Sequence, residues 1–216
     1  MHSSVGVIAA HGCSPIVRIA APTNELVKRA LDTGCHGIMV PMMGNAADAA
    51  TLVSFAKFPV PTALRAQNSS LISGIRGVGS PFAPAVFGQN LGDYISTANQ
   101  NTMVIVQIES VEGLNNCEEI AKVPGIDMLF IGPNDLCSSM GFVAGDHESI
   151  PEVQAAIARI LAACKAAGIK AGMFCTAGEQ VFKRHEQGFD FMNLGLDILA
   201  IGAWNAAELA KISSLR

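Results

Sequence analysis

The chain has little charge, and the charge it has is mixed. Only 15% of its 216 residues are charged, and the formal net charge is −4 with no basic block. A nucleic-acid-binding surface needs clustered positive charge, so the sequence argues against nucleic acid as a partner. No apolar run reaches the roughly 18 residues of a membrane span, and no signal-peptide pattern is present. We therefore expect a cytoplasmic protein with no membrane partner.

Paired cysteines and metal-binding histidine motifs are also missing. The five histidines lack the spacing of metal ligands, and no Gly-x-Gly-x-x-Gly follows a predicted strand, which argues against a dinucleotide fold. No Cys-x-x-Cys pair occurs among the six cysteines, Cys13, Cys35, Cys117, Cys137, Cys164 and Cys175. This scatter favours buried thiols in a reducing compartment over disulfides or a zinc site.

No lysine is placed for Schiff-base chemistry. Lys170 is the one lysine that touches a predicted strand, and it lies at the start of that strand. Barrel enzymes carry their catalytic groups at the opposite, carboxyl ends of the strands. If the protein acts on carbonyl carbons, we expect it to use a metal ion as electron sink.

The chain does contain a regular alternation of short apolar runs and helical stretches, which predicts a parallel sheet. Short connections favour a TIM (β/α)8-type barrel over an open sheet. The predicted strands are Pro15–Ile19, Gly37–Met42, Gly74–Gly79, Met103–Glu109, Asp127–Pro133, Lys170–Cys175 and Phe191–Leu196. The predicted helices are Thr23–Thr33, Ala46–Lys57, Ser110–Lys122, Pro151–Ala167, Gly178–Gln187 and Ala203–Ser213.

Seven strand–helix units are fewer than a complete barrel has. Such a barrel usually takes about 250 residues, and residues 1–12 of this chain read as the tail of a helix. We expect an N-terminally truncated barrel, with one strand and its rim loop missing at the front, and a single domain over residues 1–216.

Two carboxylates follow neighbouring apolar runs. Glu109 closes the run that begins at Met103, and Asp135 follows the run that begins at Asp127. They lie 26 positions apart, about one strand–helix–strand repeat, so they should emerge side by side at the carboxyl ends of adjacent strands. Adjacent carboxylates repel unless a cation lies between them, and oxygen ligands suit Mg²⁺ or Mn²⁺. We predict that Glu109 and Asp135 are metal ligands, although Asp135 could instead cap a helix.

Polar residues at the same ends of the strands are candidates for substrate binding. Gln107 is two residues before Glu109, so both point to one side of the strand. Arg18 is the only charged residue in Pro15–Pro22 and needs an anion, either a structural carboxylate or a substrate carboxylate. We favour the substrate. Arg76 lies in a glycine-rich passage that could approach an anionic ligand or could only shape a loop. Asp32, at a helix end beside Gly34, is expected to be a surface carboxylate, and the alternative is that it serves a neighbouring active site.

Five runs of this sequence together resemble one protein family. They are Pro15–Arg18, Gly37–Pro41, Gly74–Ser80, Val106–Glu109 and Phe130–Leu136. In this order they resemble the HpcH/HpaI aldolase and citrate lyase family, and most of all its 4-hydroxy-2-oxoheptanedioate and 2-dehydro-3-deoxyglucarate aldolases. The resemblance covers nearly the whole chain. The Gln-x-Glu run and the Gly-Pro-x-Asp-Leu run are its specific parts.

The resemblance implies a (β/α)8 barrel, typically a hexameric homo-oligomer, and a class II aldolase. Such an enzyme uses Mg²⁺ or Mn²⁺ to cleave a small-molecule 4-hydroxy-2-keto acid to pyruvate and an aldehyde. Carried over, Glu109 and Asp135 hold the metal, Arg18 is catalytic and binds the keto acid, and Gln107 supports the site. Backbone groups near Gly79, Ser80, Gly132 and Pro133 are expected to line it.

Two departures from the family pattern concern activity. The family has an acidic segment with a histidine after its first strand, and no histidine of this chain matches it. The segment Val60–Ser73 is longer than in the family, with Ala63–Ser70 as an apparent insertion. One alternative is therefore an impaired homologue that binds metal or keto acid, or assembles with full-length subunits. The other is a CoA-thioester lyase of the citrate lyase type, for which no cluster of basic residues is seen.

Overall fold

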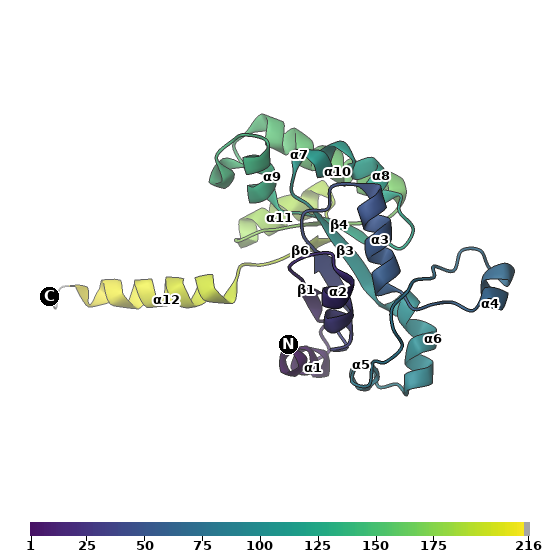
Figure 1. Ribbon diagram of the computed structural model, residues 1–216. Coiled ribbons are helices and arrows are strands. Elements are labelled where there is room, and N and C mark those ends of the chain that lie inside the picture. Colours follow the sequence, from purple (N-terminus) through teal and green to yellow (C-terminus); the bar gives the residue numbers. More distant parts are fainter. Residues whose placement is uncertain (214–216) are drawn as a thin grey trace.

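The computed structural model describes residues 1–213 and contains one parallel sheet of six strands in the order β1-β2-β3-β4-β5-β6. Each strand therefore pairs with its neighbours in the chain, and helices connect them (Figure 1). The strands are β1 Ile16–Arg18, β2 Gly37–Val40, β3 Met103–Ile108, β4 Met128–Ile131, β5 Lys170–Met173 and β6 Phe191–Met192. Since β1 and β6 are the two edges of this sheet, the described residues form an open sheet and not the closed barrel that the sequence suggested.

The helices differ widely in length and in their position relative to the sheet. Three of them, α10 Pro151–Ala167, α8 Cys117–Ala121 and α3 Ala46–Ala56, lie together over one face of the sheet (Figure 1). The others are α1 His2–Ala10, α2 Asn24–Leu31, α4 Thr62–Gln67, α5 Ala83–Val86, α6 Leu91–Asn101, α7 Val111–Asn115, α9 Pro133–Ser139, α11 Gly178–Gln187 and α12 Asp197–Lys211. Within residues 1–213, none has both the length and the apolar character required to cross a bilayer.

The expected strand at Gly74–Gly79 is wrong, so the sheet has six strands rather than seven. The backbone there bonds to the end of α3 instead of to a strand: Ile75 N donates to Ser54 O at 2.7 Å, and Arg76 N to Lys57 O at 3.0 Å. A Cβ at Gly74 would lie 2.2 Å from the carbonyl oxygen of Lys57. The glycine thus permits a close approach of two backbones. In the sequence, an apolar run flanked by glycines looks the same whether it makes this contact or forms a strand.

Side-chain caps explain several helix boundaries. Thr23 accepts a hydrogen bond from Leu26 N at the start of α2, and Asn45 accepts one from Asp48 N at the start of α3. Gly168 ends α10 in the left-handed conformation with φ of 70°. The expected helix Ser110–Lys122 is divided into α7 and α8 at Asn116, whose side chain donates to Gly44 O at 2.8 Å.

Two segments extend from the body of the protein. The expected insertion Ala63–Ser70 carries the short helix α4, which has no buried residue. Helix α12 also has no buried residue, and it begins at Asp197, earlier than expected. In Figure 1 it extends away from all other elements.

Alternate residues of the strands face two different apolar clusters. On the outer face, Val104, Val106 and Ile108 of β3 pack with the helices in the main core. On the inner face, Ile105 packs with Met39, Met128 and Phe130 in a smaller cluster. Gln107 and Glu109 continue the inner face of β3 because side chains alternate along a strand. The pleat therefore directs both polar groups to the interior of the curved sheet, at its carboxyl end.

Candidate active site

A cavity of about 610 Å³ lies at the carboxyl ends of the strands. It contains most of the residues predicted to form the site, namely Arg18, Gln107, Glu109, Gly132, Pro133 and Asp135. Apolar residues of the inner face form the rest of its wall, among them Met39, Phe130, Phe174 and Phe191. The site thus combines a small group of charged and polar side chains with an apolar surround, which is the usual composition of a small-molecule site.

Three polar side chains in this cavity form a hydrogen-bonded row. Arg18 Nε donates to Gln107 Oε1 at 2.6 Å, and Gln107 Nε2 donates to Glu109 Oε1 at 2.9 Å. Gln107 and Glu109 are buried, with 5% and 3% of their surfaces exposed, whereas Arg18 is exposed. The amide of Gln107 therefore fixes the cation and the carboxylate relative to each other, although they come from β1 and from the end of β3.

The backbone holds the second oxygen of Glu109. Met42 N donates to Glu109 Oε2 at 3.1 Å, and Met42 has a φ of 56°. A left-handed conformation is unfavourable for a methionine by about 1–2 kcal/mol. The hydrogen bond to a buried carboxylate is a contact that can offset this strain.

Gly132 leaves the space that Glu109 occupies. A Cβ on this residue would lie 2.2 Å from Glu109 Oε1 and 2.9 Å from its Cγ. Real Cβ atoms do not approach other atoms so closely, so a glycine is required between β4 and α9 if Glu109 is to keep its position.

Asp135 lies in the first turn of α9, directly after β4. Pro133 is the first residue of this helix, where its missing N–H costs no hydrogen bond. Gly132 precedes the helix without a side-chain cap, so Asp135 is not the N-cap that the sequence left open. The short β4–α9 connection brings its exposed carboxylate to the cavity that Glu109 lines.

The surroundings raise the pKa of Glu109 above its usual value. Burial is the largest cause, because it removes water from the carboxylate, and the negative charge of Asp135 adds to it. The N–H of Met42 and the guanidinium of Arg18 act in the opposite direction. The carboxylate pair is thus electrostatically unfavourable without a cation.

The donor set fits a hard divalent cation. Both acidic side chains offer oxygen, which Mg²⁺ and Mn²⁺ prefer, and these ions commonly bind through one or two carboxylates with water and substrate as further ligands. Within residues 1–213 no group of three or more His, Cys, Asp or Glu side chains is arranged to hold a metal. Glu109 and Asp135 would therefore hold such an ion with non-protein ligands completing its coordination.

The structure does not bring Ser80 to this cavity. Its hydroxyl is buried and donates to Asp32 Oδ1 at 2.8 Å. Gly79 is in the same loop, and its carbonyl accepts a hydrogen bond from Lys28 Nζ at 2.9 Å. Both residues belong to a polar network beside α2, so a role for them in binding substrate stays a prediction.

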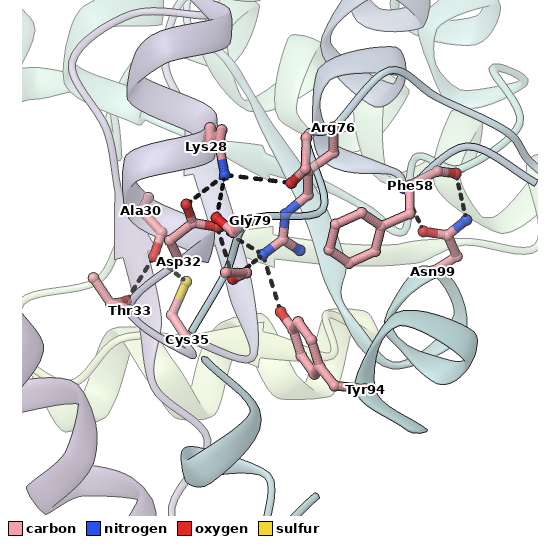
Figure 2. A network of polar contacts seen from close by, with 12 residues as sticks. Lys28, Ala30, Asp32, Thr33, Cys35, Phe58, Arg76, Gly79, Tyr94 and Asn99 are labelled. Carbon is pink, nitrogen blue, oxygen red and sulfur yellow. Dashed lines mark hydrogen bonds and ion pairs between the residues drawn. The ribbon is translucent and has the colours of Figure 1, made fainter. Parts of the chain in front are cut away.

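Arg76 and Asp32 are the centre of that network (Figure 2). Arg76 Nη2 donates to Asp32 Oδ1 at 3.2 Å and to Tyr94 Oη at 3.1 Å, and its guanidinium lies 4.3 Å from the centroid of the Phe58 ring. Lys28 forms a second ion pair with Asp32 at 2.6 Å. Asp32 is thus a paired, partly exposed carboxylate that joins α2 to the loop before α5.

Two residues that shape the site were not expected from the sequence. Met42 contributes only its N–H, to Glu109, and a backbone donor has no side-chain signature. Asn193, which lines the cavity, accepts from Cys175 N at 2.9 Å and donates to Cys175 O at 2.6 Å. It joins the ends of β5 and β6. Its place as the one polar side chain within the predicted strand Phe191–Leu196 is the signal that could have found it.

Comparison with known proteins identifies relatives of the whole chain. The family model described as HpcH/HpaI aldolase/citrate lyase matches residues 2–201. A hydroxypyruvate/pyruvate aldolase of Paraburkholderia phytofirmans is 40% identical over 194 residues, which are 89% of this chain and 70% of that protein. A 4-hydroxy-2-oxo-heptane-1,7-dioate aldolase of Salmonella dublin is 39% identical over 199 residues, which are 91% of this chain and 70% of that protein.

Solved structures agree with these matches. A HpcH/HpaI aldolase/citrate lyase family protein of Burkholderia cenocepacia superposes with a TM-score of 0.81 and 34% identity. The match covers 98% of this chain and 79% of that one. A HpcH/HpaI aldolase of Desulfitobacterium hafniense gives a TM-score of 0.85 at 25% identity, over 100% of this chain and 78% of that one.

Proposed function

Because the chain belongs to the HpcH/HpaI aldolase/citrate lyase family, we propose that it is a metal-dependent aldolase. It cleaves a 4-hydroxy-2-keto acid to pyruvate and an aldehyde. The observation that carries this proposal is the row Arg18–Gln107–Glu109, which shares one cavity with Asp135. Relatives named as pyruvate and heptanedioate aldolases support the substrate class.

Glu109 and Asp135 are the residues that would hold Mg²⁺ or Mn²⁺. When bound, the ion acts as a Lewis acid that withdraws electron density from the keto group of the substrate. The carboxylates set its position, and that of Glu109 is fixed at both oxygens, by Gln107 Nε2 and by Met42 N. This arrangement supports an ordered site, since neither oxygen of the buried side chain can rotate without breaking a hydrogen bond.

Arg18 binds the anionic end of the keto acid. Its Nε donates to Gln107, which leaves the two terminal nitrogens to donate to a carboxylate or a keto oxygen. A guanidinium in this place also stabilises the negative charge that develops on the keto oxygen as the C3–C4 bond breaks. Gln107 keeps Arg18 and Glu109 apart at a fixed distance, and the backbone around Gly132 and Pro133 borders the substrate.

The test is an aldol-cleavage assay with Mg²⁺ in which pyruvate release is measured for the wild type, Glu109→Gln and Asp135→Asn. We expect wild-type activity that EDTA abolishes and that Mg²⁺ or Mn²⁺ restores, and a loss of about a hundredfold or more in both variants. Glu179→Gln, at an acidic residue of α11 outside the cavity, is the matched control and should retain activity. Metal-independent cleavage, or full activity in both variants, would refute the proposal.

We also propose that the protein is a homo-oligomer, in line with the hexamer that the family resemblance implies. Helix α12 carries several large apolar side chains, yet none is buried. Among them, Ile198 is 68% exposed, Ile201 60% and Trp204 65%. A helix with several exposed large apolar side chains is typical of a protein interface. The six cysteines are all free, which supports a reducing compartment such as the cytoplasm.

A further inference from the structure

A second cavity, of about 740 Å³, lies far from the candidate active site, at the amino ends of the strands. Lys57 and Asp127 both line it. Lys57 Nζ donates to the carbonyl of Thr102, the residue before β3, and Asp127 Oδ2 accepts from Val104 N in β3. Glu109 follows the opposite end of the same strand. The cavity is therefore separate from the proposed aldolase site, and ligand binding in it is independent of the proposed function.

The segment Val60–Ser73, which the sequence predicts to be longer than in the family, forms one side of this cavity. The two ends of the segment are joined, since Val60 N donates to Ser73 Oγ at 2.9 Å. Asn99 of α6 anchors it, because Asn99 Nδ2 donates to Ile72 O at 3.2 Å and to Phe58 O at 3.0 Å. Seven apolar residues line the cavity from both sides, Pro59, Val60, Pro61, Leu64, Leu71, Ile72 and Ile95. Five uncharged polar residues also line it, Asn68, Ser70, Ser96, Asn99 and Gln100.

The charged end of the cavity holds a buried ammonium group. Lys57 is only 2% exposed, and its Nζ donates to the carbonyls of Asn99 and Thr102 at 2.8 Å each. Within residues 1–213 no carboxylate lies within ion-pair distance of it, so its third N–H has no partner there. Burial lowers the pKa of Lys57, while the more distant charge of Asp127 raises it.

Asp127 supplies the opposite charge at the same end. It is half-buried, and Val104 N bonds to Oδ2 at 2.7 Å, which leaves Oδ1 as an acceptor. A ligand with only a negative charge would be repelled by Asp127, and a ligand with only a positive charge would be repelled by Lys57. A ligand that carries both charges as substituents of one carbon, together with an apolar body, meets the two groups and the apolar wall together.

We propose that this cavity binds an apolar amino acid as a zwitterion, with its carboxylate at Lys57, its ammonium group at Asp127 and its side chain against the apolar residues of the 60–73 segment and α6. The volume is ample for such a ligand, since small-molecule cavities span roughly 300–1,000 Å³. The ligand would contact both the 60–73 segment and α6. It would therefore hold the 60–73 segment, which is otherwise largely exposed, against the body of the protein.

Calorimetric titration of the full chain with L-leucine tests the proposal. Two analogues separate the charges, because 4-methylpentanoate lacks the ammonium group and 3-methylbutylamine lacks the carboxylate. We expect saturable binding of leucine, and binding weaker by about tenfold or more for each analogue. No saturable heat at millimolar leucine, or equal binding of either analogue, overturns the proposal.

Variants locate the binding. Asp127→Asn retains an oxygen that can accept from Val104 N but removes the charge, so leucine affinity should fall by about tenfold with the fold intact by circular dichroism. Ile95→Trp should fill the apolar part and weaken binding similarly. Glu109→Gln, in the other cavity, should bind leucine as the wild type does. Wild-type affinity in Asp127→Asn overturns the proposal, as does loss of leucine binding in Glu109→Gln, since leucine would then occupy the candidate active site.

Discussion

Gly132 and Glu109 are in such close contact that any side chain at residue 132 would overlap the carboxylate. A methyl group there would lie 2.2 Å from Glu109 Oε1. The overlap displaces Glu109 from Gln107 and Met42, which hold its two oxygens. The space that this glycine leaves is thus part of the proposed metal site.

We predict that Gly132→Ala lowers the affinity for Mn²⁺ by about tenfold or more, because Glu109 can no longer keep both hydrogen bonds while it binds the ion. Titration with Mn²⁺, followed by electron paramagnetic resonance, measures the change. Gly178→Ala is the matched control, since nothing lies within 4 Å of a Cβ built on Gly178. Unchanged Mn²⁺ affinity in Gly132→Ala would show that Glu109 is not held as the structure indicates.

Arg18→Lys tests the role of the guanidinium. A lysine keeps the charge but cannot donate to Gln107 and to a substrate carboxylate in the same planar geometry. We predict that KM for the keto acid rises by about tenfold while Mn²⁺ affinity stays within about twofold, since Arg18 is not a metal ligand in this assignment. Steady-state kinetics and a Mn²⁺ titration give the two values. If KM and kcat are both those of the wild type, Arg18 has no part in substrate binding.

Much of the site could be predicted because it follows from strand geometry. The two-residue spacing of Gln107 and Glu109 places them on one face of a strand, and one strand–helix–strand repeat separates Glu109 from Asp135. No such rule applies to Met42, which contributes a backbone N–H in a left-handed conformation. Nor does one apply to Ser80, which the glycine-rich passage carries to Asp32 rather than to the cavity.

The elements that the sequence did not predict have physical reasons as well. Helix α6, Leu91–Asn101, is rich in polar residues and contains a glycine, a composition that is also typical of a loop. The sequence does contain a signal for the start of this helix, because asparagine is a favoured N-cap residue. In the structure, Asn90 accepts a hydrogen bond from Asp93 N at 2.9 Å. The passage at Gly74 predicts a strand because apolar residues between glycines give the same pattern whether the backbone bonds to a sheet or to the end of a helix.

The raised pKa of Glu109 makes metal binding and stability depend on pH. The folded protein holds a proton on Glu109 more tightly than the unfolded chain does, mainly through burial and then through Asp135. In the metal-free protein this group therefore favours the folded state at low pH, and its contribution is lost as the pH rises through the raised pKa. Mn²⁺ must displace that proton in order to bind. On acidification, the affinity for Mn²⁺ should therefore begin to fall at a pH above the usual pKa of a glutamate.

Thermal unfolding with and without Mn²⁺ across this pH range checks both parts. We predict that the gain in Tm from Mn²⁺ is large at neutral pH and disappears on acidification. Asp135→Asn should gain little from Mn²⁺ at any pH, since it lacks a ligand. A gain in Tm that is independent of pH would mean that the ion binds elsewhere.

The exposed apolar residues of α12 lead to a prediction about assembly. If a second copy covers this helix, Ile201→Glu places a charge in that interface, and the mass found by analytical ultracentrifugation should fall from an oligomer to a monomer. Phe182→Glu on α11 is the control, because Phe182 is an apolar residue that is also largely exposed, at 68% against 60% for Ile201, but lies on another helix. Trp204 is the only tryptophan of the chain and reports on the same helix. Its emission should shift to longer wavelength in Ile201→Glu as water reaches it. A wild-type protein that sediments as a monomer would contradict the proposed homo-oligomer.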